Sequence, residues 1–153
     1  RSLGEFIETA KTKEWWNQTL IVLVTDHGSR VGNLSSYEKI RFNIPMLWLG
    51  GALNIRDTII HKIGSQTDIP LTLLKQLDLP AEDFKFSKDL FSEDSKSFAY
   101  YTYNDGFGFL YDSSFSVYSL ITKEFLENDF PSSLEVDPGL AFFQNLMTDF
   151  NER

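Results

Sequence analysis

Cysteine is absent from the 153 residues of this sequence, which excludes disulfide bonds and thiol catalysis. No apolar run is long enough to cross a bilayer, and no segment resembles a secretory signal peptide. The first residue is Arg1 rather than methionine. We therefore expect a piece of a longer protein, with any targeting or membrane segment outside these residues.

Positive charge is also scarce, since the net charge is −8. This balance argues against a nucleic acid partner, whose phosphates bind basic surfaces. The charge is unevenly distributed: residues 1–75 carry nine basic and seven acidic side chains, whereas residues 76–153 carry five and fifteen. We therefore expect that the first half does not repel an anionic substrate and that the second half is a solvated, acidic appendage.

The first part of the chain has the pattern of an α/β protein. The apolar content of the whole sequence, 42%, is sufficient for a core. The pattern predicts a helix ending near residues 15–18, strands over 20–25 and 44–49, a short strand over 58–60, and a helix after Asp68. This order is typical of the trailing part of a mainly parallel sheet with flanking helices.

The second part has a different, antiparallel pattern. Residues 81–96 are charged and weakly apolar, which indicates a linker. Asn104-Asp105-Gly106 is a strong hairpin signal between two aromatic-rich strands, and Asp137-Pro138 opens a final helix. The strands are predicted over residues 98–103, 107–111 and 115–121. The sequence thus predicts an α/β portion over residues 1–95 and a small antiparallel meander with a carboxyl-terminal helix over residues 96–153.

The segment Leu20–Gly28 is the most informative about function. Its unbroken apolar run predicts a strand buried on both faces of a parallel sheet. Asp26 and His27 follow at the carboxyl end of that strand, where open α/β sheets place their ligand sites. An adjacent carboxylate and imidazole can supply half of a metal site.

Three segments together resemble the carboxyl-terminal part of the sulfatase and alkaline phosphatase superfamily. They are Val24-Thr25-Asp26-His27-Gly28, Asn43-Ile44-Pro45-Met46-Leu47 and Ser65-Gln66-Thr67-Asp68-Ile69-Pro70-Leu71-Thr72-Leu73-Leu74. Their order and spacing match over roughly residues 5–80. Within the superfamily, the chain looks closest to the branch of lipoteichoic acid synthases and their sulfatase-annotated relatives.

The resemblance implies a role for Asp26 and His27 as ligands of one catalytic divalent metal, which is manganese, calcium or zinc in different relatives. It also implies that the nucleophile, a threonine, serine or cysteine-derived formylglycine, precedes Arg1. The fragment alone is then inactive. The parent would be a hydrolase or phosphoglycerol-type transferase acting on an anionic sulfate or phosphate ester. The family expectation places it outside the cytoplasm, attached to a membrane only through an upstream helix.

A second hypothesis belongs to a different functional class. Asp26 and His27 also fit a turn carboxylate beside a surface histidine, and the chain would then be a non-catalytic glycan- or protein-binding domain of the same ancestry. Aromatic residues in the predicted meander could form the binding surface of such a domain. Alternating aromatic residues in a sheet are, however, usually cross-strand pairs and part of the core. These residues are Tyr100, Tyr101, Tyr103, Phe107, Phe109 and Tyr111.

The remaining candidate residues carry weaker signals. Arg30 is a weak candidate for binding a phosphate or sulfate oxygen, and Arg41 is a weaker one. His61 has no partner at ligand spacing, so a single metal is expected. Asp68 is expected to cap a helix rather than to catalyse. Ser29 is rejected as a triad nucleophile, because nearly consecutive residues rarely converge in the required geometry.

Overall fold

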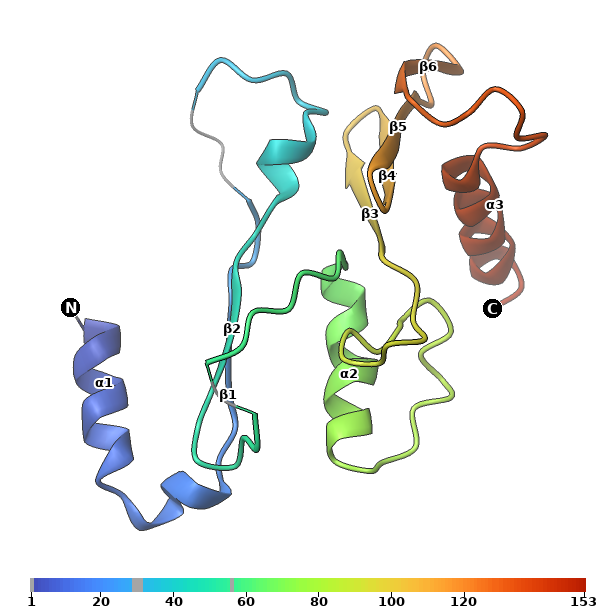
Figure 1. Ribbon diagram of the computed structural model, residues 1–153. Coiled ribbons are helices and arrows are strands. Elements are labelled where there is room, and N and C mark those ends of the chain that lie inside the picture. The colour runs from blue at the N-terminus through green and yellow to red at the C-terminus, as the bar shows by residue number, and fades with distance from the viewer. Residues whose placement is uncertain (1, 29–31, 56) are drawn as a thin grey trace. The chain divides into compact units, whose positions relative to one another are not determined.

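The computed structural model describes residues 2–28, 32–55 and 57–153 (Figure 1). The chain forms two compact units, which are Arg1–Leu34 with Ile40–Ile59, and Ser35–Lys39 with Ile60–Arg153. We call them unit 1 and unit 2. Among the described residues, none of the helices combines the length and apolar character that a membrane span requires.

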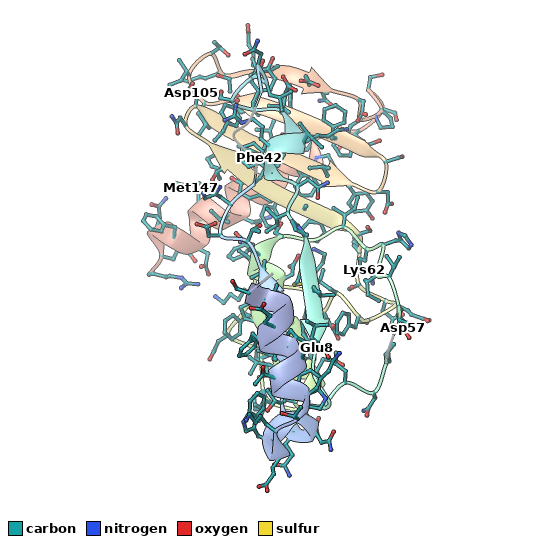
Figure 2. All side chains as sticks on the ribbon, turned by 90° about the vertical axis from the view of Figure 1, so that its left-hand side faces the viewer. Glu8, Phe42, Asp57, Lys62, Asp105 and Met147 are labelled. Carbon is teal, nitrogen blue, oxygen red and sulfur yellow. The ribbon has the colours of Figure 1, made fainter. Side chains whose placement is uncertain are left out.

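Unit 1 contains a helix and a pair of strands. Its elements are α1 (Ser2–Lys11), the 3-10 helix η1 (Glu14–Gln18), β1 (Ile21–Val24), the 3-10 helix η2 (Lys39–Phe42), which starts in unit 2, and β2 (Met46–Leu49). In Figure 2, Glu8 marks α1 and Phe42 marks the end of η2. The strands β1 and β2 lie side by side, with Ile21 opposite Leu49 and Val24 opposite Met46.

Three expectations for unit 1 are wrong. The strands β1 and β2 are antiparallel, not parallel. They are only partly buried, with Val24 40% and Leu47 52% exposed, and residues 58–60 form no strand. Parallel neighbours need a long crossover, usually helical, whereas the described part of the connection holds only the short helix η2. A run of apolar residues therefore predicts a strand but not the direction of that strand relative to its neighbour.

Unit 2 contains the predicted meander and two longer helices. Its elements are the 3-10 helix η3 (Gln66–Asp68), α2 (Ile69–Gln76), β3 (Phe98–Tyr103), β4 (Gly106–Tyr111), β5 (Ser114–Ser119), β6 (Glu124–Asn128) and α3 (Pro138–Asn151). The four strands pair antiparallel in sequence order. Tyr103 faces Gly106 across the predicted turn, which confirms the hairpin. The strand β6 was not predicted, because its charged residues are all exposed.

The aromatic residues of the meander form a core under α3. Phe107 is 1% exposed, and its ring stacks on that of Phe143 at a centroid distance of 4.9 Å. The Asp137 carboxylate accepts hydrogen bonds from the amides of Gly139 and Leu140, so α3 begins after it as predicted. For Phe107 and its stacked neighbours, the interpretation as cross-strand pairs and core is confirmed.

Residues 81–96 are packed and do not behave as a linker. Ala81 and Leu90 are buried, and the Leu90 amide donates a hydrogen bond of 2.9 Å to the buried Thr72 hydroxyl. The compact units divide near residue 60, and the domain boundary at residue 95 stays a prediction. Polar residues in this segment suggest solvent exposure in the sequence, but several of its polar groups form hydrogen bonds with buried side chains.

A buried ion pair between Asp68 and Lys88 joins this segment to α2 and the sheet. The Asp68 carboxylate accepts hydrogen bonds from the Lys88 amide, from its Nζ at 2.5 Å and from the Ser65 amide. Lys88 Nζ also donates to the Phe98 carbonyl of β3. Burial lowers the pKa of Lys88, and its contact with Asp68 opposes that shift. Asp68 is thus structural as expected, but its side chain does not cap α2.

We expect Lys88→Met to lower the free energy of unfolding by about 3–5 kcal/mol, because it leaves the Asp68 carboxylate buried and unpaired. The matched control is Lys85→Met, which removes the ion pair to Asp149 from a lysine that is 65% exposed. It should have a much smaller effect, because solvent screens such pairs. Urea unfolding monitored by tyrosine and tryptophan fluorescence measures both. Equal losses in the two variants would contradict the central role of the buried pair.

Candidate metal half-site

The two predicted metal ligands lie directly after β1. Asp26 and His27 follow Thr25 where the strand ends, and Gly28 is the last described residue before the gap at residues 29–31. Both side chains are accessible, with Asp26 87% and His27 60% exposed.

Backbone groups fix the geometry of the pair. The His27 amide donates a hydrogen bond of 2.9 Å to Asp26 Oδ1, and His27 Nδ1 lies 2.8 Å from the Gly28 carbonyl oxygen. A carbonyl only accepts, so Nδ1 carries the proton and Nε2 keeps its lone pair when the imidazole is neutral. Metal-bound histidines are oriented in this way by a hydrogen bond from the other ring nitrogen.

The spacing of the donor atoms fits a shared divalent ion. His27 Nε2 lies 3.8 Å from Asp26 Oδ2. Metal bonds to imidazole nitrogen and carboxylate oxygen are each about 2.0–2.2 Å, so two such bonds span up to about 4.2 Å. The described residues contain no group of three or more potential ligand side chains. The pair therefore fits two positions of a coordination sphere, and other ligands would have to complete it.

A close backbone contact holds the turn after the pair. A Cβ on Gly28 would lie 1.7 Å from the Arg41 carbonyl oxygen, so only glycine fits there. The Arg41 guanidinium donates a hydrogen bond of 2.9 Å to the Leu34 carbonyl. Arg41 thus has a structural contact within unit 1, which was not foreseen from the sequence.

The remaining candidates from the sequence are Arg30, Ser29 and His61. Arg30 and Ser29 fall outside the described residues. His61 is exposed and belongs to unit 2, whereas Asp26 and His27 belong to unit 1. Sequence reasoning thus identified the adjacent pair, but it missed the support from the Gly28 carbonyl and from the backbone of Arg41. A glycine directly after the pair was the available signal for a close approach.

Comparison with known proteins finds a solved structure with a similar fold. No family model matches the sequence. The structure is similar to the crystal structure of a protein in the alkaline phosphatase superfamily from Vibrio parahaemolyticus, with a TM-score of 0.70 and 24% sequence identity. The match covers 97% of this chain and 40% of that protein, so the chain spans less than half its length. This chain thus has the fold of one part of that protein.

Gly28→Ala should destabilise unit 1, by about 1–3 kcal/mol, because the new Cβ collides with backbone rather than with a movable side chain. The matched control is Gly4→Ala in α1, where a Cβ meets nothing within 4 Å. That change should be neutral or stabilising by about 0.5–1 kcal/mol, as expected for glycine within a helix. Thermal unfolding of both variants checks this, and a Gly28→Ala protein as stable as the parent would disprove the close approach.

Proposed function

We propose that this chain is part of a metal-dependent enzyme of the alkaline phosphatase superfamily. Asp26 and His27 would supply two ligands of one divalent ion, either manganese, calcium or zinc. The observation that carries the proposal is the orientation of His27, whose Nε2 lies beside the Asp26 carboxylate while Gly28 holds Nδ1. The similarity in fold to a protein of that superfamily adds support.

Each residue of the half-site has a distinct task. The Asp26 carboxylate brings negative charge to the ion, and neutral His27 brings a nitrogen ligand whose direction is set by the Gly28 carbonyl. When bound, the ion would supply Lewis-acid chemistry at a phosphate or sulfate oxygen. The nucleophile and the remaining ligands would come from residues outside this sequence.

The proposed substrate is an anionic ester, either a sulfate ester or a phosphoglycerol-type phosphodiester. The first 75 residues carry a small excess of basic side chains, so this half does not repel an anion. Resemblance to the lipoteichoic acid synthase-like branch favours a transferase or hydrolase of this kind. It also favours a location outside the cytoplasm, with membrane attachment through an upstream segment.

The test is turnover by the full-length protein that contains this chain. We expect metal-dependent cleavage of either an aryl sulfate or an aryl phosphodiester, with manganese, calcium and zinc added separately after chelation. Both Asp26→Asn and His27→Gln should lower kcat/KM at least about 100-fold, because loss of a metal ligand removes the bound ion or misplaces it.

Matched variants separate loss of the site from general damage. His61→Gln removes the other histidine of these 153 residues, and Asp57→Asn neutralises another exposed aspartate of unit 1, so both should keep near-parental activity. Full activity in Asp26→Asn or His27→Gln would overturn the assignment. Absence of turnover with every metal in a folded parent, together with no bound metal, would favour the non-catalytic hypothesis.

A further inference from the structure

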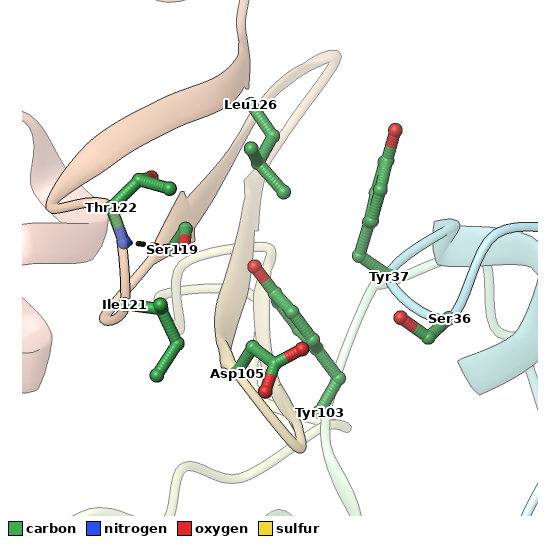
Figure 3. A pocket seen from close by; sticks show the side chains of 8 residues that line it. All are labelled: Ser36, Tyr37, Tyr103, Asp105, Ser119, Ile121, Thr122 and Leu126. Carbon is green, nitrogen blue, oxygen red and sulfur yellow. Dashed lines mark hydrogen bonds between the residues drawn. The ribbon is translucent and has the colours of Figure 1, made fainter.

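Unit 2 contains an open pocket that the proposed metal chemistry does not use. Its volume is about 510 Å³, within the usual range for small-molecule sites. Figure 3 shows Ser36 and Tyr37 on one side and Ile121 and Thr122 on the other, with Tyr103 and Asp105 between them. The pocket therefore lies at the end of the sheet where the β3–β4 and β5–β6 turns are located.

The wall formed by Tyr37 is fastened to the sheet. The Tyr101 hydroxyl of β3 donates a hydrogen bond of 2.8 Å to the Tyr37 carbonyl. Two residues further along, Lys39 Nζ lies 3.8 Å from the centre of the Phe115 ring on β5. These contacts hold the short segment 35–39 against strands that are distant in sequence.

Two aromatic rings therefore meet at the pocket. The centroids of Tyr37 and Tyr103 lie 6.1 Å apart, and their planes are inclined by 53°. The Tyr103 hydroxyl donates to the Tyr118 carbonyl at 3.0 Å, which fixes its ring on the sheet. The apolar side chains of Ile121 and Leu126 also line the space.

The electrostatic character of the pocket is negative. Asp105 contributes a carboxylate, and among the residues that the structure describes no lysine, arginine or histidine lines the pocket. Burial raises the pKa of Tyr103, and the charge of Asp105 raises it further. An anionic group would be repelled here, so this pocket is unsuited to the phosphate or sulfate of the substrate proposed above.

We propose that this pocket binds a quaternary ammonium group. Such cations are recognised by aromatic faces, here Tyr37 and Tyr103, through their attraction to the ring electrons. Asp105 supplies the opposite charge. Because a quaternary ammonium has methyl groups and no N–H donors, it also suits the apolar contacts with Ile121 and Leu126.

Two hydroxyl groups of the pocket are already engaged in hydrogen bonds, which makes them less suited to a sugar. A sugar needs several free hydrogen-bonding partners in fixed positions, but the Ser119 hydroxyl already accepts a hydrogen bond from the Thr122 amide. The Tyr103 hydroxyl is likewise engaged with the Tyr118 carbonyl. The hydroxyl groups of Ser36, Tyr37 and Thr122 also line the pocket, and the faces of the rings and the Asp105 carboxylate are the groups that would recognise a cation.

Choline and its neutral isostere 3,3-dimethylbutan-1-ol provide the direct test. Titration of each into isotopically labelled protein, followed by NMR, should show saturable shifts at Tyr103, Asp105 and Thr122 with choline only. Asp105→Asn keeps the shape and should weaken choline binding about fivefold to tenfold. The matched control, Asp112→Asn, changes an aspartate in the turn between β4 and β5 and should not alter binding.

The contribution of the ring is tested at Tyr37. Tyr37→Phe keeps an aromatic face and should bind choline nearly as well, whereas Tyr37→Ala should lose about tenfold in affinity. Amide spectra that match the parent protein outside the pocket show that each variant is folded. Equal binding of the neutral isostere, equal effects of Asp105→Asn and Asp112→Asn, or no saturable choline shift would overturn the proposal.

Discussion

The buried ion pair between Asp68 and Lys88 is the interaction on which unit 2 depends. The Asp68 carboxylate accepts hydrogen bonds from Ser65 and Lys88. Lys88 Nζ also donates a hydrogen bond to the Phe98 carbonyl at the start of β3. Ser65 in turn exchanges hydrogen bonds with the backbone of Tyr100. A single carboxylate thus ties the segment before α2, the segment after it and the outer strand of the meander into one structure.

At both proposed sites, as at the ion pair, contacts between residues that are distant in sequence hold the backbone in place. In unit 1, the Gly28 carbonyl orients His27, while the backbone around Arg41 leaves no room for a side chain at Gly28. In unit 2, the Tyr37 carbonyl is held by the Tyr101 hydroxyl, which sets one wall of the aromatic pocket. Each site has exposed functional groups on a backbone fixed by contacts distant in sequence, as preorganised binding requires.

The sequence predicted features that depend on local chemistry. The turn at Asn104-Asp105 and the cap at Asp137 both follow from neighbouring residues. Features set by distant partners were missed. The direction of β2 relative to β1 depends on the path of the chain that connects the two strands. The role of Asp68 depends on Lys88, which lies twenty residues away. The charged residues 81–96 indicate a linker in the sequence because their bonding partners are distant and cannot be identified from the sequence.

Binding of one divalent ion by Asp26 and His27 together can be measured by paramagnetic NMR with manganese. Substoichiometric Mn²⁺ should broaden the amide signals of residues 25–28 first, and His27→Gln should abolish this selectivity. The acidic strand β6, with Glu124 and Glu127, provides an internal comparison for non-specific binding of cations. Broadening centred on β6, with residues 25–28 unaffected, would contradict the account.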